Sequence, residues 1–186
     1  MQSYQIFKTK QQLFKEGVKL LEDFCILNNI QRPIIREKAF GNNAGMYYSG
    51  VLHINLSRCT QMTMGKPIRK WSYPGYKVDK TAYGVINHEF GHYLDNLFGI
   101  VNYFKNLKKR EKPLTGYCPN LFEFLAEHLR LFMTNPDLLK KGRPQTYSIL
   151  VGVFRLKPIE KRKWKEVLKD AHPDFIKACI NFINNK

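Results

Sequence analysis

The stretch Val85-Ile86-Asn87-His88-Glu89-Phe90-Gly91-His92-Tyr93-Leu94-Asp95 decides how this chain is interpreted. Apolar residues in and around it recur at helical spacing, and Gly99 follows where a helix would end. Residues four apart lie one above the other on a helix, so His88 and His92 can point two imidazoles at one metal ion. Glu89 would lie beside that ion as a general base. The stretch therefore predicts a zinc site on a helix.

The alternative interpretation is a pair of core histidines satisfied by hydrogen bonds. Three fixed positions in five residues occur by chance in unrelated chains, so the motif alone is modest evidence. The alternative, however, leaves Glu89 as a carboxylate that needs a partner of its own. We therefore favour zinc, which keeps a position for water beside three protein ligands and lowers the pKa of that water to about 7.

Composition predicts one basic globular domain. The chain has 186 residues, of which 44% are hydrophobic, enough for a buried core. Its net charge of +16 predicts an acidic or polyanionic partner. Four widely spaced cysteines form no C-x-x-C pair and are expected to be free thiols. We expect a soluble protein, because the sequence shows neither a signal peptide nor an apolar run of the ~18 residues that a membrane span needs.

Helical and strand patterns follow one another along the first part of the chain. Residues 8–29 predict an amphipathic helix, and Pro33–Phe40 predicts a strand that begins a hairpin. Tyr47-Tyr48 and Val51–Leu56 are predicted as strands on either side of Ser49-Gly50. In the second of these strands, alternate residues are apolar, as expected for a strand with one side on the core.

Irregular segments separate the later helices. Residues 58–80 predict a long loop beside a cleft, and the basic run Lys105–Lys112 predicts a solvated surface loop. A second apolar helix begins at Asn120, a good N-cap, and Asn135-Pro136 ends it. The segments within 157–185 are expected to be helices that pack beneath the others.

The helix that begins at Asn120 can supply the missing ligand. A later histidine of the H-E-x-x-H-x-x-G-x-x-H type is excluded, because Asp95 and Phe98 occupy the positions of its glycine and third histidine. Glu123 and Glu127 lie four apart on one face of an apolar helix, where carboxylates are costly unless paired or bound to metal. One of them is expected to bind the metal and the other to accept a hydrogen bond from a ligand imidazole.

Other roles for the acidic residues stay open at this point. Asp95, three residues beyond His92, is a further candidate to hydrogen-bond a ligand histidine. Glu127 and Asp95 could instead form ordinary ion pairs with Arg130 or a lysine. His53 is a less favoured metal ligand, because a strand histidine more often faces solvent or a neighbouring side chain.

A family resemblance rests on two stretches, His88–His92 with Asp95 and then Glu123–Leu131. Together they resemble the C-terminal metallopeptidase domain of anthrax toxin lethal factor. Relatives of that domain include Pro-Pro endopeptidases and metallopeptidase domains of phage proteins. The resemblance covers roughly residues 51–132 and, more faintly, 175–183.

The fold that this resemblance implies is an α+β, zincin-like fold with a small twisted mixed sheet, the motif helix and a helical C-terminal part. We expect a single domain over residues 1–186, with an upper α/β part of about 1–99 and a helical lower part of about 100–186. The resemblance also implies a protein that is cytoplasmic or released with a phage or toxin particle.

The resemblance further assigns roles to the acidic residues. It implies that Glu123 completes the zinc site with His88 and His92, and that Glu127 is the hydrogen-bond partner of a ligand. It also implies that the strand Val51–Leu56 is the edge along which an extended peptide substrate pairs.

The resemblance implies an oxyanion-stabilising tyrosine shortly before the third ligand. Tyr117 matches it, although it is shifted by one residue from the family's spacing. Tyr103, Tyr73 and Tyr76 are the alternatives.

The expected function is that of a zinc-dependent endopeptidase with Glu89 as the general base. One alternative is a basic zincin-fold protein that binds nucleic acid or acts on nucleic-acid-bound proteins, with Lys105–Lys112 and Lys157–Lys169 as phosphate contacts. Another is a non-catalytic zincin scaffold, which the presence of Glu89 disfavours.

Overall fold

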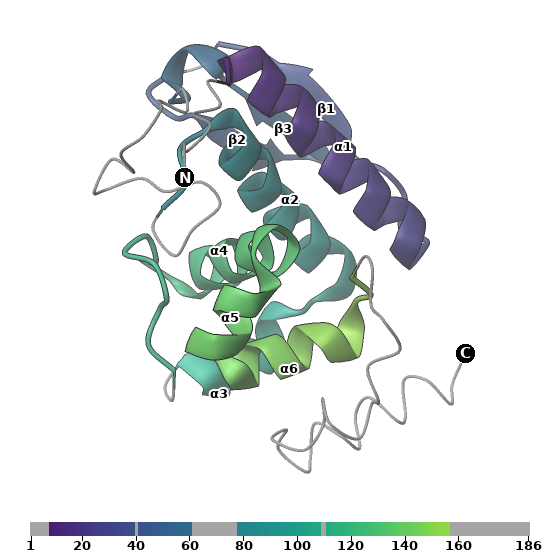
Figure 1. Ribbon diagram of the computed structural model, residues 1–186, viewed down its shortest axis with the longest axis vertical. Coiled ribbons are helices and arrows are strands. Elements are labelled where there is room, and N and C mark those ends of the chain that lie inside the picture. Colours follow the sequence, from purple (N-terminus) through teal and green to yellow (C-terminus); the bar gives the residue numbers. More distant parts are fainter. Residues whose placement is uncertain (1–7, 40, 61–77, 109–110, 157–186) are drawn as a thin grey trace, which may run out of the picture.

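The structure is a computed structural model, and it describes residues 8–39, 41–60, 78–108 and 111–156. The elements in chain order are α1 (Lys10–Asn28), β1 (Ile34–Glu37), β2 (Gly45–Tyr48), β3 (Val51–Ile54), the short 3-10 helix η1 (Leu56–Arg58), α2 (Ala82–Phe98), α3 (Val101–Lys108), α4 (Leu121–Thr134), α5 (Pro136–Gly142) and α6 (Pro144–Val153). This mixture of helices and a small mixed sheet confirms the α+β class. Figure 1 shows α1 and the sheet at one end, α3, α5 and α6 at the other, and α2 and α4 between them.

Helix α2 is the central helix of this arrangement, and it packs against α1, α4, β2 and β3. It begins at the N-cap Thr81, whose hydroxyl accepts a hydrogen bond from the N–H of Gly84 at 3.2 Å. It ends at Gly99, which adopts the left-handed conformation with φ of 61°. The predicted helix and its predicted end are therefore confirmed. Contact on several sides fixes the orientation of the side chains that α2 presents.

Helix α4 lies close against α2. The Asn120 side chain accepts a hydrogen bond from the N–H of Glu123 at 2.9 Å, which confirms the predicted cap. Asn135 ends the helix as predicted, and Pro136 begins α5 directly afterwards. A Cβ atom at Gly91 of α2 would lie only 2.7 Å from the Cα of Ala126, so the two backbones can approach this closely only with glycine there. The face of α2 with the two histidines therefore meets α4.

The sheet has the strand order β1-β3-β2. Strands β2 and β3 form an antiparallel hairpin around Ser49-Gly50, as predicted, whereas β1 pairs in parallel with β3, with Ile34 opposite Val51. The expectation that Pro33–Phe40 begins a hairpin is therefore wrong. The expectation that Val51–Leu56 is an edge is also wrong, because β3 has a hydrogen-bonded neighbour on each side and ends at Ile54.

Helix α3 corrects a third expectation. Lys105–Lys112 was predicted as a loop, but the run begins inside α3, which extends to Lys108. The carboxylate of Asp95 accepts a hydrogen bond from the N–H of Val101 at 2.7 Å at the start of this helix, and Phe104 anchors it in the core. A run of basic residues therefore does not exclude a helix, because such residues can lie on the solvent-facing side of one.

The remaining expectations concern the cysteines, membrane spans and two segments that lie mostly outside the described residues. Cys25, Cys59 and Cys118 are free thiols, as expected. No helix within the described ranges is long and apolar enough to cross a membrane. Most of the predicted loop 58–80 and the predicted helices within 157–185 lie outside the described residues.

Candidate metal centre

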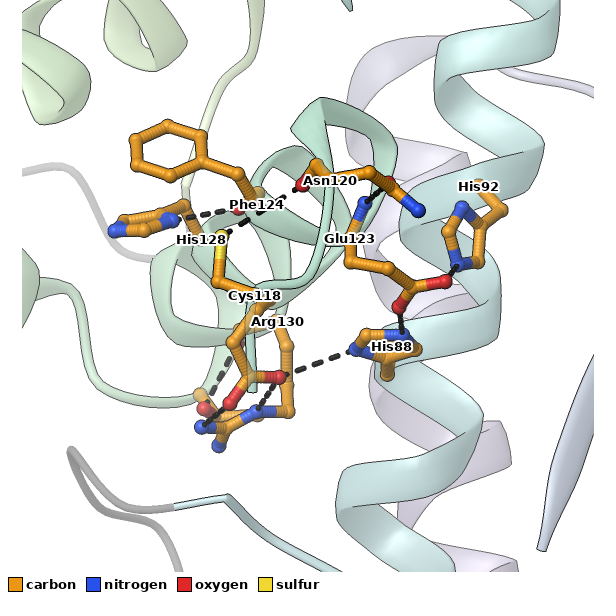
Figure 2. A network of polar contacts seen from close by, with 10 residues as sticks. His88, His92, Cys118, Asn120, Glu123, Phe124, His128 and Arg130 are labelled. Atoms are coloured by element: carbon orange, nitrogen blue, oxygen red, sulfur yellow. Dashed lines mark hydrogen bonds and ion pairs between the residues drawn. The ribbon is translucent and has the colours of Figure 1, made fainter. Parts of the chain in front are cut away.

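Three side chains from two helices meet at one point in the structure. His88 and His92 lie one turn apart on α2, and Glu123 extends toward both from the first turn of α4 (Figure 2). His88 Nε2 lies 2.9 Å from Glu123 Oε2, and His92 Nε2 lies 3.6 Å from Glu123 Oε1. One potential ligand atom from each residue lies within 4.8 Å of the other two.

The donor set and its spacing fit a zinc ion. Two imidazole nitrogens and one carboxylate oxygen are a common ligand set for catalytic zinc, and such a site keeps a position for water. Ligand atoms about 2.0 Å from a tetrahedral ion would lie about 3.3 Å from one another, close to the contacts between Glu123 and the two histidines. Glu123 is therefore the carboxylate that can complete the site.

Glu127 lies behind His88 and has two partners. Its Oε2 lies 3.1 Å from His88 Nδ1, which leaves Nε2 of that ring to face Glu123. Arg130, with a fully buried side chain, donates to both Glu127 oxygens, at 3.0 Å from Nε and 2.7 Å from Nη2. Two parallel hydrogen bonds from one guanidinium fix both the position and the orientation of a carboxylate. The two alternatives for Glu127, a histidine partner and an ion pair with Arg130, thus occur together.

The acidic neighbours change the protonation of His88. Burial alone would lower the pKa of its imidazole, but the hydrogen bonds with Glu123 and Glu127 outweigh burial and raise the pKa to about 10. In turn, the contacts of Glu123 with His88 and His92 hold the pKa of the Glu123 carboxyl well below its usual range. Without a metal ion, the site is therefore a protonated histidine held by carboxylates, and a metal ion must displace that proton.

Glu89 lies on the next position of α2 and is almost completely buried. Burial raises the pKa of its carboxyl, while the nearby His88 and His92 oppose the rise. Its carboxylate also accepts a hydrogen bond from the backbone N–H of Tyr47 in β2. A buried carboxyl with a raised pKa, held beside a metal-binding group, has the properties of a general base.

Gly45 provides the room for this carboxylate. A Cβ atom at Gly45 would lie 2.5 Å from Glu89 Oε1 and 2.6 Å from Val85 Cγ1, closer than real Cβ contacts occur. Any other residue at this position would therefore displace Glu89 or push β2 away from α2. The sequence marks Gly45 only as part of a turn cluster, so its contact with the base becomes visible only in the structure.

We expect Gly45→Ala to lower turnover about 10- to 100-fold without loss of metal, because a 1 Å displacement of a catalytic group can cost about that much. Zinc content should stay at the wild-type level, because the atoms nearest to an added methyl group belong to Glu89 and Val85, which are not among the three converging residues. Gly116→Ala is the matched control, since a methyl group there meets no atom within 4 Å. Wild-type turnover in Gly45→Ala would contradict the role assigned to this glycine.

Tyr117 lies at the mouth of the site. Its ring centroid is 5.7 Å from that of His88, and its side chain remains 46% exposed. Burial and the negative charge of Glu123 raise the pKa of its phenol, so the hydroxyl keeps its proton. Of the alternatives, Tyr103 is on α3 and does not line the cleft, and Tyr73 and Tyr76 lie outside the described residues.

Asp95 lines the same cleft, but its carboxylate accepts hydrogen bonds from the backbone of Ile100 and Val101. Within the described part of the chain, no hydrogen bond joins Asp95 to His92. Asp95 therefore joins the end of α2 to the start of α3, about one helical turn beyond His92.

The site opens into a cleft of about 870 Å³. The cleft extends from His88, His92 and Glu123 along β2 and reaches Arg58 at the end of η1. A volume of this size can hold several residues of a peptide. The three candidate ligands, Glu89 and Tyr117 all line it.

Comparisons of the chain with family models, with curated proteins and with solved structures found no match. The zincin-like fold and the resemblance to the lethal factor domain therefore stay predictions.

Proposed function

We propose that this chain is a zinc-dependent endopeptidase with a zincin-like arrangement of its active site. The observation that carries the proposal is the convergence of His88, His92 and Glu123 in a cleft that also contains Glu89. The likeness of the two helical motifs to those of the lethal factor domain supports the same reading. When bound, a zinc ion would polarise the scissile carbonyl and acidify a water molecule.

The residues of this chain then have separate tasks. Glu89 accepts a proton as the water attacks the carbonyl carbon, and it passes that proton to the amine when the C–N bond breaks. Tyr117 donates a hydrogen bond to the oxygen on which negative charge develops. Glu127 accepts a hydrogen bond from His88 Nδ1 and thereby keeps Nε2 directed at the ion.

The substrate is expected to lie along β2. Among the described strands, β2 has β3 on one side only, and Gly45, Met46 and Tyr47 line the cleft. A strand edge offers backbone donors and acceptors to an extended peptide, whose side chains alternate in direction. The proposed peptide-binding edge is therefore β2 and not Val51–Leu56, whose strand β3 is central in the sheet.

Digestion of a peptide library with and without a chelator tests this proposal. We expect internal cleavage by the zinc-loaded protein and no cleavage after chelation. Chelator-resistant cleavage would contradict the metal mechanism, and an undigested library would contradict the peptidase function.

The alternatives that the sequence raised gain no support from the site. Nucleic-acid binding still rests on the net charge of +16, and part of its proposed contact surface, Lys157–Lys169, lies outside the described residues. In a non-catalytic scaffold, the buried carboxylate of Glu89 would destabilise the fold without contributing to a reaction, because burial of a charged group costs free energy. We therefore keep the peptidase as the proposed function.

A further inference from the structure

We infer that the η1 end of the cleft selects substrates with an acidic side chain, and that Arg58 is the residue that makes this selection. The inference rests on the proposed peptidase function and adds the chemical class of the substrate to it. It comes from the way charges are distributed along the cleft.

Arg58, the last residue of η1, lines the cleft and is exposed to solvent. Its Nη2 donates to the side-chain oxygen of Asn42 at 3.0 Å, which holds the guanidinium beside the segment that leads into β2. Within the described ranges, no carboxylate forms an ion pair with Arg58. A guanidinium that is positioned but not neutralised can bind a carboxylate with two parallel hydrogen bonds.

The backbone around Arg58 brings a second cation to the same end of the cleft. Thr60 donates its N–H to the carbonyl of Lys80 at 2.8 Å, and Thr60 and Thr81 form a parallel bridge. Lys80 is exposed and also lines the cleft. Two cationic residues from separate segments therefore line the cleft, and a backbone hydrogen bond joins these segments.

The acidic side chains of the cleft are held by contacts within the protein, and Glu89 accepts a hydrogen bond from the backbone N–H of Tyr47. Glu123 and Glu127 contact the histidines, and Arg130 neutralises Glu127. The carboxylate of Asp95 accepts from the backbone at the α2–α3 junction. Asp79, next to Lys80, is buried and accepts a hydrogen bond from the N–H of Thr81 at 2.9 Å. Among the described residues that line the η1 end, the exposed charged side chains are those of Arg58 and Lys80, so the charge that a substrate meets there is positive.

A peptide on the edge of β2 would extend toward this end. Asn42, Asn43 and Ala44 line the cleft and connect directly to Gly45, the first residue of β2. A substrate residue that passes this segment lies beside Asn42, whose side chain holds the guanidinium of Arg58. Acidic selection should therefore act at one side of the scissile bond.

The test uses peptides that differ at one flanking position, which carries Glu, Gln or Lys in turn. Where the varied position lies beside Arg58, we expect kcat/KM to be about tenfold higher for the Glu peptide than for the Lys peptide. This ratio corresponds to the free energy of a partly exposed, charge-assisted hydrogen bond. The preference should weaken as the salt concentration rises. Arg58→Glu should reverse it, with the Gln peptide changed least.

Lys141→Glu is the matched control, because it makes the same change in net charge at an exposed position on α5, which does not line the cleft. This variant should keep the Glu preference. Equal cleavage of all three peptides by the unmodified protein, or an unchanged preference in Arg58→Glu, would overturn the inference.

A binding measurement separates this inference from the proposed function. Fluorescence anisotropy with the same labelled peptides and zinc-loaded Glu89→Gln protein measures selection without cleavage. Tighter binding of the Glu peptide that disappears in the Arg58→Glu double variant would support acidic selection, even if the protein cleaved no peptide. Equal binding of the three peptides would overturn it, even if cleavage occurred.

Discussion

Glu89→Gln is expected to lower kcat for peptide cleavage by about 10²–10⁴-fold, the usual contribution of a general base. The amide has almost the same shape as the carboxylate but cannot accept the proton of the attacking water. Because Glu89 is not among the three converging ligands, the variant should still bind zinc. Steady-state kinetics on a peptide substrate, together with metal analysis of the same sample, gives both values.

The control for this variant is Glu37→Gln, the same chemical change on the exposed strand β1. It should leave both turnover and zinc content unchanged. If Glu89→Gln cleaved as fast as the unmodified protein, Glu89 would not be the base. If it lost its metal, the assignment of ligands would need to include it.

Replacement of His88 by Ala should have the second large effect, the loss of bound zinc. It removes one of three ligands and leaves Glu127 without its histidine partner. We expect metal analysis after gel filtration to fall from about one zinc ion per chain to near zero. His53→Ala, on β3 and away from the site, should keep its zinc. A fully loaded His88→Ala protein would contradict the proposed centre.

The pH dependence of zinc binding follows from the same histidine. With its pKa raised to about 10, His88 carries a proton at neutral pH in the metal-free protein, whereas zinc requires the neutral ring. Zinc and a proton thus compete, and the competition weakens as the pH rises toward the pKa. We expect the association constant to increase at least about tenfold per pH unit between pH 6 and 8. A pH-independent constant, measured by competition with a zinc-binding dye, would contradict this protonation state.

The end of α2, the start of α4 and the positions of His88 and His92 were predictable because they depend on chemistry that is local in the sequence. Gly99 and Asn120 end or begin helices through contacts within one turn. His88 and His92 face one side of α2 because helical spacing places them there, and the same spacing places Glu123 and Glu127 together on α4. Local spacing could not decide which glutamate contacts both histidines, because that depends on how α2 and α4 pack.

The features that were missed depend on contacts between distant segments. Strand β1 pairs with β3 and not with β2, its neighbour in sequence. Strand β3 is therefore central, and β2 is an outer strand. Gly45 is in a turn-like sequence, and only the approach of α2 reveals its contact with the base.

The central claim is that one zinc ion at His88, His92 and Glu123 supports peptide cleavage. Titration of the metal-free protein with zinc, while the initial rate of peptide cleavage is measured, tests it most directly. The account predicts no activity without zinc, a rise in proportion to added metal and a plateau at one equivalent. Activity that does not depend on zinc, or no activity at any ratio although one equivalent is bound, would contradict it.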